Sequence, residues 1–482
     1  MKRFLWLGFV ALVYVICSGC GETFRPIIIP NPPTFPNPAA AHTVVSINQN
    51  VTDNLTQERG SAMVIDVSGD SIVSVADCTT ALCLGFAPVH AVQQAASQVL
   101  VANQFDSISK VNFSGTTMSS TTTISLPVNS APSFVATTES SQAYVLLPGY
   151  VNPVTSLVVP SVGVINTNSN NLVTTIPLSN NAGANPVAMA ETLDTKKLYV
   201  ADDSLPCNNP PTPGVCSISA FNTVDQSSRA ISGALATPPI WLSARSDSQA
   251  VYVLEASGTL AWISTISTSG PDTLAETTIS VPGANIMIYD PNLNRLYIPG
   301  GQEVAIVDVS QSPPVALAGG PIAIPTVAPG SRTAGDPCFL TGAQPLTVAA
   351  AAALPDGSRA YVGAYYEDAS DNICPQATVI DVASNAIKTS IAIPGFAAYD
   401  AFCSSTRFRI MMAAAGDSTR AYLSSCDGGN VNIIDTSNDS YILNQPEPIG
   451  SRKPIGTNPL SPPQNPVSVS YTHLTLPTTP YV

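Results

Sequence analysis

One short pattern recurs along the chain and constrains its fold more than any other feature. Examples are "KLYVAD", "AVYVLE" and "RAYVGA", and a second motif such as "ATVIDVA" follows each copy. A threonine- and isoleucine-rich segment such as "LVTTIPL" and a segment such as "NPVAMAE" complete the unit. All four alternate, are rich in β-branched residues and are bounded by turns such as "PDGSR". Four short strands in each repeated unit predict the blades of an all-β β-propeller. The copies of the first motif are anchored on Val44, Leu100, Tyr144, Tyr199, Tyr252, Tyr297, Tyr361 and Tyr422.

The number of blades follows from counting these segments. The second, third and fourth strands of a blade each occur eight times if residues 42–76 are included, whereas complete first strands occur seven times. The segment "QNPVSVS", which begins at Gln464, has the pattern of the missing strand. An open ring would leave sheet edges exposed. We therefore predict eight four-stranded antiparallel blades, with N- and C-terminal strands sharing one blade; seven blades is the alternative.

The tyrosine–valine motif followed by valine–isoleucine–aspartate closely resembles the YVTN-type β-propeller repeat family. The best match is "PDGSRAYVGA…ATVIDVASNAIKTSIAIPG", from Pro355 to Gly395. The resemblance covers nearly all of the predicted propeller, residues 42–469. It implies the fold strongly and the function weakly, because similar propellers serve as surface-layer proteins, binding modules and lactone-hydrolysing enzymes.

The N-terminus reads as an export signal. Lys2 and Arg3 precede the apolar run "FLWLGFVALVYVI", and "CSGC" follows. This arrangement resembles a bacterial lipoprotein signal of residues 1–19, with Cys20 as the lipidated residue. The proline-rich residues 20–41 then form a tether. These features predict a lipid-anchored protein of the cell envelope, at the outer membrane and on its periplasmic or surface face; an ordinary secretory signal is the alternative.

Charge limits the class of partner. Charged residues make up only 10% of the sequence, and the net charge is −14. An acidic surface disfavours nucleic-acid phosphates and anionic lipid headgroups, both of which attract lysine and arginine. We therefore expect no nucleic-acid partner and contact with a membrane through the lipid anchor only.

Eight of the ten cysteines lie outside the signal, an even number that suits an oxidising compartment. In a propeller, the loops that hold them would all lie on one face. Their places in the repeat favour four disulfides, because consecutive blades carry cysteines at equivalent positions. A metal site is the alternative, but the spacing and the scarcity of histidine disfavour it. The predicted pairs are Cys78–Cys83, Cys207–Cys216, Cys338–Cys374 and Cys403–Cys426.

The same face carries the long loops, where binding sites on rigid scaffolds usually occur. We expect it to bind a protein, peptide or glycan, and the alternative is that the loops merely cover strand ends. Three acidic residues there could also hold Ca²⁺, although the spacing matches no EF-hand loop; we otherwise expect no cofactor. The candidate contact residues are Tyr365, Tyr366, Glu367, Asp368 and Asp371.

Catalysis has little support in the sequence. The histidines are His42, His90 and His473, and none belongs to a visible nucleophile–base arrangement. We therefore assign no catalytic residue and favour a binding or scaffold module. A metal-dependent, lactonase-like hydrolase is the alternative, and carboxylates or asparagines converging on the central channel would favour it. Residues 470–482 resemble translated sequencing-adapter DNA, and a native disordered tail is the alternative.

Overall fold

The computed structural model describes residues 43–48, 59–76, 82–95, 97–114, 117–138, 141–178, 185–203, 218–332, 334–336, 338–394, 403, 409–427, 430–442 and 466–471. The chain divides into two compact units, Met1–Asn37 and Pro38–Val482. All described residues belong to the second unit, and the predicted signal, Cys20 and the tether lie outside the described residues. Across the described ranges, no helix is long and apolar enough to cross a membrane.

The described strands form eight sheets, numbered here as blades 1 to 8 in ring order. Blade 1 contains β1 (Thr43–Asn48), β2 (Ser61–Asp66), β3 (Ser71–Ala76) and β34 (Pro466–Tyr471); blade 2 contains β4 (Pro88–Ala95), β5 (Gln98–Asn103), β6 (Ser107–Ser114) and β7 (Thr117–Ser125); blade 3 contains β8 (Phe134–Ala136), β9 (Gln142–Leu147), β10 (Ser161–Asn166) and β11 (Asn171–Pro177); blade 4 contains β12 (Pro186–Glu191), β13 (Lys197–Asp202), β14 (Ile218–Asn222) and β15 (Ser228–Arg229).

The other four blades follow the same order, with small additions at the outer edges of two of them. Blade 5 contains β16 (Ile231–Ser232), β17 (Pro239–Ala244), β18 (Ala250–Glu255), β19 (Thr259–Ser264) and β20 (Asp272–Ser280); blade 6 contains β21 (Ile288–Asp290), β22 (Arg295–Gly300), β23 (Glu303–Asp308), β24 (Val315–Ala316) and β25 (Ile322–Ala323), with the 3₁₀ turn η1 (Leu317–Gly319); blade 7 contains β26 (Thr347–Ala353), β27 (Arg359–Glu367), β28 (Ile373–Asp381) and β29 (Ala386–Ala392); blade 8 contains β30 (Ile410–Ala414), β31 (Arg420–Ser425), β32 (Asn430–Asp435) and β33 (Ser440–Tyr441).

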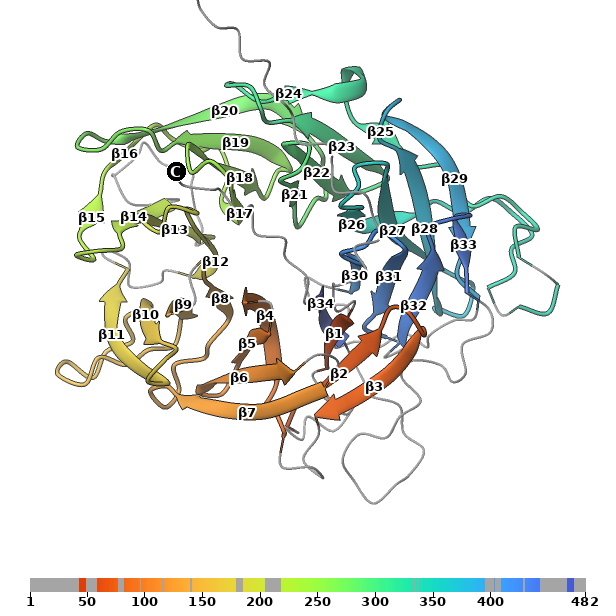
Figure 1. The fold of residues 1–482 in the computed structure, drawn as a ribbon. Helices are drawn as coiled ribbons and strands as arrows, with labels where there is room; N and C mark the ends of the chain where they lie inside the picture. Colours follow the sequence, from red (N-terminus) through yellow and green to blue (C-terminus); the bar gives the residue numbers. More distant parts are fainter. Residues whose placement is uncertain are drawn as a thin grey trace, which may run out of the picture. The chain divides into compact units, whose positions relative to one another are not determined.

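The eight blades follow one another around a ring, and the first strand of each lies toward its centre (Figure 1). This confirms the predicted all-β, eight-bladed propeller and excludes the seven-bladed alternative. Strands within a blade pair antiparallel; β16 departs from this, because it pairs parallel with β20 at the outer edge of blade 5.

Blade 1 closes the ring with strands from both ends of the chain, as predicted. Strand β34 pairs antiparallel with β1, placing Ser468 opposite Ile47 and Tyr471 opposite Val44. The strand thus extends two residues beyond residue 469, the predicted end of the propeller. Its pairing satisfies backbone groups along the β1 edge that would otherwise be exposed. Residues 472–482, including His473, lie outside the described part of the chain.

Apolar clusters fill the interfaces between neighbouring blades. The cluster between blades 8 and 1 joins Tyr422 and Ile433 to Val44 and Met63, all of them almost completely buried. Equivalent clusters join the other blades around the ring. The second strand of each blade therefore has buried side chains on both of its faces, as expected when both faces of a sheet are covered. The ring is closed by side-chain packing as well as by the β1–β34 ladder.

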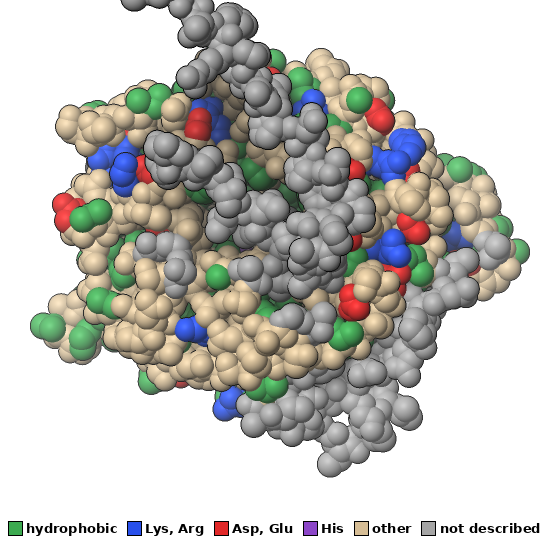
Figure 2. Space-filling model, in the orientation of Figure 1, with side chains coloured by type: hydrophobic (Ala, Val, Ile, Leu, Met, Phe, Trp, Pro, Cys, Tyr) green, Lys and Arg blue, Asp and Glu red, His purple; other side chains and the backbone are tan. Residues whose placement is uncertain are grey.

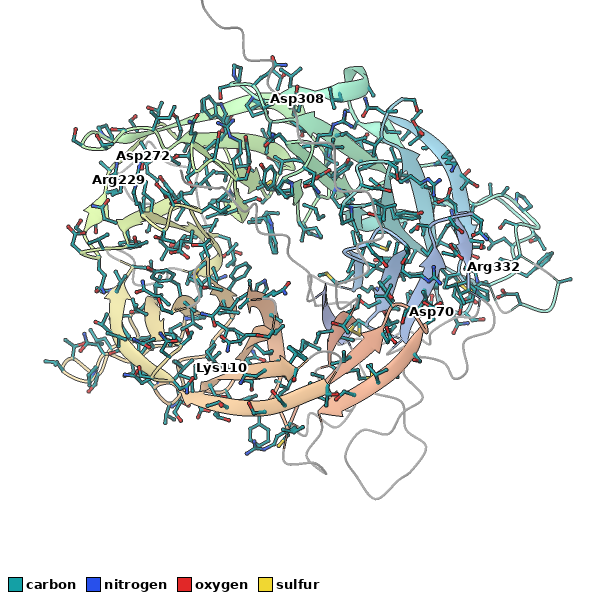
Figure 3. All side chains as sticks on the ribbon, in the orientation of Figure 1. Asp70, Lys110, Arg229, Asp272, Asp308 and Arg332 are labelled. Atoms are coloured by element: carbon teal, nitrogen blue, oxygen red, sulfur yellow. A yellow bond between two sulfur atoms is a disulfide. The ribbon has the colours of Figure 1, made fainter. Side chains whose placement is uncertain are left out.

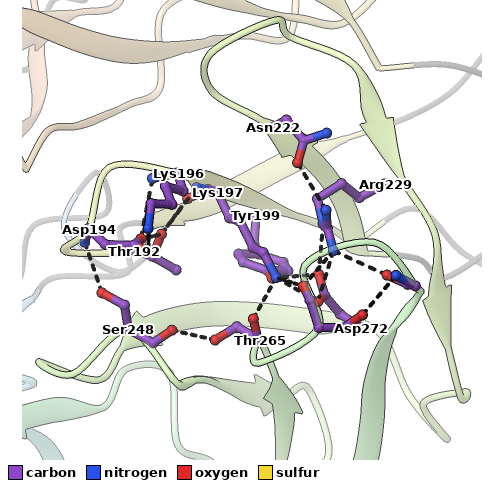
Figure 4. A network of polar contacts seen from close by, with 12 residues as sticks. Thr192, Asp194, Lys196, Lys197, Tyr199, Asn222, Arg229, Ser248, Thr265 and Asp272 are labelled. Carbon is purple, nitrogen blue, oxygen red and sulfur yellow. Dashed lines mark hydrogen bonds and ion pairs between the residues drawn. The ribbon is translucent and has the colours of Figure 1, made fainter.

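A polar clamp also joins neighbouring blades, and in blades 4 and 7 it includes the tyrosine of the repeat. In blade 4, the ammonium of Lys197 and the hydroxyl of Tyr199 both donate to the carboxylate of Asp272 in blade 5, at 2.8 and 2.7 Å (Figure 4). Asp272 is fully buried and also accepts from Arg229 at 3.2 Å. Burial raises the pKa of Tyr199, and its hydrogen bond to Asp272 raises this pKa further. The hydroxyl therefore stays protonated and donates.

The same clamp recurs around the ring, so Asp70, Lys110 and Asp272 lie at separate blades in Figure 3. In four further pairs, a basic side chain of one blade reaches an aspartate or asparagine in the third-to-fourth-strand turn of the next blade. That residue has a positive φ, which these short polar side chains tolerate. The pairs are Lys110–Asn170 (3.1 Å), Arg295–Asn385 (3.1 Å), Arg359–Asp439 (2.9 Å) and Arg420–Asp70 (2.8 Å).

Strand directions assign every connection to one of two faces. Because neighbouring strands are antiparallel, the second-to-third-strand loops and the connections to the next blade lie on one face. We call this the disulfide face; it includes residues 126–133, 147–161, 324–346, 367–373 and 426–427. The turn face, opposite it, carries the short first-to-second- and third-to-fourth-strand turns, including the clamps.

Candidate functional site

Two of the four predicted disulfides are present in the structure. Cys338 is bonded to Cys374, and Cys403 to Cys426. All four of these cysteines are buried, and each bridge ties an incoming connection to the second-to-third-strand loop of its blade. Two disulfides indicate an oxidising environment. Bridges of this kind stabilise a fold by about 2–4 kcal/mol each.

The predicted Cys78–Cys83 disulfide is wrong, because Cys83 is a free cysteine. Its sulfur accepts a weak hydrogen bond from the Arg59 guanidinium at 3.9 Å. Nearness in sequence, on which this pair rested, does not bring two sulfurs into bonding geometry. Cys78, Cys207 and Cys216 lie outside the described residues, so the pair 207–216 stays a prediction.

The disulfide-braced end of blade 7 holds the five predicted contact residues, and Tyr366 supports the loop from inside. Its side chain is 2% exposed, and its hydroxyl donates to the backbone carbonyl of Cys338 at 2.6 Å. The guanidinium of Arg332 lies 5.8 Å from the Tyr366 ring centre. Arg332 is labelled in Figure 3. Burial raises the pKa of Tyr366. The structure leaves Tyr366 little surface for a partner.

Tyr365 and Glu367, on either side of Tyr366 in the strand, contact the buried guanidinium of Arg409. The Arg409 guanidinium lies 5.1 Å from the Tyr365 ring centre and 3.7 Å from a Glu367 carboxylate oxygen. Arg409 is held from behind by two 2.8 Å hydrogen bonds to Asp427, whose side chain is fully buried. Burial alone would lower the pKa of Arg409, but its bonds to Asp427 raise it instead. The Glu367 side chain remains 48% exposed.

Asp368 and Asp371 shape the turn between β27 and β28. Asp368 accepts hydrogen bonds from the amides of Ser370 and Asn372 at 2.7 and 2.9 Å, and from the Asn372 side chain. Burial alone would raise its pKa, but these donors, Asn372 first, lower it. Asp371 is exposed, with φ +61°. Within the ranges that the structure describes, no three His, Cys, Asp or Glu side chains form a group suited to a metal ion.

The sequence analysis did not identify Arg332, Arg409 and Asp427 as site residues, although their contacts hold the site together. Arg332 donates to the Pro375 carbonyl at 2.8 Å, and Arg409 comes from another connection altogether. Arg332 belongs to no repeat motif, and Arg409 is only the first residue of the repeat segment "RIMMAAA". The one signal available was that an arginine precedes the first strand of blade 8, beside a predicted disulfide.

An aromatic cluster lies at the inner strands, and its Trp241 packs against the same apolar cluster as Tyr365. His90 of β4 stacks on Phe134 of β8, with ring centres 3.7 Å apart. Trp241 of β17 meets the same Phe134 ring edge-on at 5.6 Å, although a whole blade separates β8 from β17 along the ring. Trp241 also packs against the apolar clusters of blades 5–6 and 7–8. Strands β4, β8 and β17 therefore meet through aromatic side chains.

His90 has a structural part in this cluster. Its Nδ1 accepts the backbone N–H of Val135 at 3.4 Å while its ring stacks on Phe134.

No protein-family model matches this sequence, and no curated protein does either. Solved structures with similar folds include the β-propeller domain of Cps50 (Swd1) from Myceliophthora thermophila, with 7% identity, a TM-score of 0.43 and coverage of 78% of this chain and 90% of that one. A functionally unknown protein from Desulfotomaculum acetoxidans has 11% identity, a TM-score of 0.41 and coverage of 83% and 94%. The structure titled U3-55K has 12% identity, a TM-score of 0.45 and coverage of 71% and 88%. The fold assignment rests on the strand topology above.

Proposed function

We propose that this chain is an exported, lipid-anchored β-propeller that acts as a binding or scaffold module at the cell envelope. Residues 1–19 would be the signal, Cys20 the lipidated residue and residues 20–41 the tether. The oxidising environment indicated by the disulfides agrees with export. An outer-membrane location and the absence of a nucleic-acid partner belong to the same proposal.

The braced end of blade 7 is the observation that carries this proposal. Two disulfides and the buried Arg409–Asp427 pair hold a small surface that presents the Tyr365 ring and the Glu367 carboxylate. Such preorganisation reduces the entropy lost when a partner binds. Exposed Asp371 adds a second negative charge. The surface suits a protein or peptide segment that carries lysine or arginine; a glycan ring stacked on Tyr365 is the other outcome to test.

The hydrolase alternative finds no supporting observation among the described residues. It required acidic or asparagine side chains converging on the channel. The inner strands instead bring together His90, Phe134 and Trp241. We therefore develop only the binding role.

A binding experiment tests the proposal on arrays of basic peptides, neutral peptides and envelope glycans. Substitution Glu367→Lys should weaken binding of basic peptides at least about tenfold, because it places a like charge against the partner. The matched control is Asp225→Lys, which makes the same charge change on the turn face. Equal binding by both variants and the wild-type protein would contradict the proposal. Loss of glycan binding alone in Tyr365→Ala would assign the surface to a glycan.

A further inference from the structure

An uncharged hairpin projects from blade 3 and gathers exposed apolar side chains at its tip. It is the loop between β9 and β10, and we call residues 149–160 the apolar hairpin. Figure 1 shows it extending outward from the ring near β11, and Figure 2 shows hydrophobic side chains at the same place. The surrounding sequence, Leu146–Val162, contains no charged residue although the chain carries a net charge of −14.

The exposure of this tip is unusual for the molecule. Val154 is 89% exposed, Leu157 65%, Val158 57% and Val151 37%. These are four of the thirteen large apolar side chains that are exposed in the described part of the chain, and they fall within eight residues. Single exposed apolar residues are common on proteins, whereas a cluster marks an interaction surface.

The hairpin is held by its own hydrogen bonds. The N–H of Asn152 donates to the Leu157 carbonyl at 2.9 Å, and that of Ser156 donates to the Asn152 carbonyl at 2.8 Å. The Asn152 side chain accepts the N–H groups of Val154 and Thr155 at 2.9 and 3.2 Å. Val151 and Val158 form a β-bridge below the tip. The backbone donors of the tip, residues 152–157, are therefore satisfied within the hairpin itself.

The base of the hairpin is fixed to the propeller. The N–H of Gly149 donates to the Ser130 carbonyl at 2.9 Å, and a side chain at Gly149 would collide with the Asn129 carbonyl at 2.3 Å. Tyr150 packs against the apolar cluster of blades 2 and 3. Val128, in the same connection as Asn129 and Ser130, is 71% exposed. The tip is thus presented in one position.

We propose that the apolar hairpin inserts its tip into the interfacial region of a lipid bilayer. Entry into lipid requires backbone donors to be satisfied within the inserted segment, which the tip achieves. It also requires no charge to be desolvated, and the segment has none. A protein partner that added a strand to the tip would need free backbone donors there, and the donors of residues 152–157 are used within the hairpin, which favours lipid. The inference goes beyond the lipid anchor at Cys20 and does not depend on it.

Tryptophan fluorescence of the full-length chain in phosphatidylcholine vesicles tests the insertion. Substitution Leu157→Trp places a reporter at the tip, and Val224→Trp is the matched control, because Val224 is 88% exposed on the turn face. Emission of the three native tryptophans is subtracted with the wild-type protein. The fluorescence emission of the tip reporter should shift to shorter wavelength and be quenched by brominated acyl chains. The emission of the control reporter should show neither change.

A second substitution makes the test quantitative. Adding Val154→Ser to Leu157→Trp should lower the ratio of inserted to free tip roughly tenfold, since burial of one valine is worth about that factor. Both positions are on the surface, so the variants should retain the circular dichroism of the parent. If the tip reporter behaves like the Val224→Trp control, the inference is overturned and a protein partner becomes the better explanation of the tip.

Discussion

Replacing Asp272 with alanine should lower the free energy of unfolding by about 3 kcal/mol, because it leaves two buried cations without their counter-ion. The Lys197 side chain is 11% exposed and that of Arg229 is 8% exposed. Lys197 donates to one Asp272 oxygen at 2.8 Å and Arg229 to the other at 3.2 Å. Removing one partner of a buried ion pair usually costs about 3–5 kcal/mol.

The lower end of that range applies here because each cation keeps other acceptors. Lys197 still donates to the carbonyl of Ser267 at 2.8 Å, and Arg229 to the Asn222 side chain at 3.0 Å. Tyr199→Phe removes only the hydroxyl bond to Asp272 and should cost about 1 kcal/mol. The two variants together separate the charge from the hydroxyl.

Urea denaturation, followed by near-ultraviolet circular dichroism, measures the effect as a shift of the midpoint at constant slope. The control is Lys196→Ala, next to Lys197 in sequence. Lys196 is 72% exposed and lies 3.4 Å from Asp194, so its removal should change the free energy of unfolding by less than about 0.5 kcal/mol. An Asp272→Ala midpoint equal to that of Lys196→Ala would refute the clamp as a stabilising device.

Three further changes test other parts of the structure. Arg420→Ala removes the two-bond clamp to Asp70 that links blades 8 and 1, and should cost about 2 kcal/mol in the same urea assay; an unchanged midpoint would show that packing and β34 close the ring unaided. Cys403→Ser, which breaks the bridge to Cys426, should cost about 2–4 kcal/mol, and added reductant should lower the wild-type midpoint toward that of the variant; insensitivity to reductant would argue against the bridge. Burial raises the pKa of Asp290, so the contribution of this carboxyl to stability is fully present below the ordinary aspartate pKa of about 4 and is lost as pH rises through the higher folded value. The melting temperature of Asp290→Asn, relative to that of the wild-type protein, should therefore rise as the pH increases from 4 to 7. A difference in melting temperature that stays constant over this range would contradict this reasoning.

The blade count was predictable because each strand carries its own local signature. Alternation of apolar residues, β-branched content and turn residues recur in each unit, and ring closure then required a strand from the C-terminus. The pairs Cys338–Cys374 and Cys403–Cys426 followed from equivalent places in consecutive blades. These inferences used only order along the chain and strand direction.

The clamps and the candidate site depend on contacts that no local pattern contains. Lys197 and Asp272 are far apart in sequence and meet only because neighbouring blades pack side by side. Tyr365 and Tyr366 look equivalent in sequence, yet adjacent residues of a strand point to opposite faces, so one is half-buried and the other is enclosed. Arg409 reaches the site from a connection without a motif.

The most direct test of the proposed binding face is photo-crosslinking in intact cells from two positions. A photoreactive residue replaces either exposed Ala369, in the β27–β28 turn of the disulfide face, or Val224 on the turn face. We predict a discrete crosslinked partner from position 369 that is absent from position 224 and is lost when Glu367→Lys is added. The same crosslinks from both positions, or a product from position 369 that Glu367→Lys leaves unchanged, would contradict the assignment of the disulfide face as the binding surface.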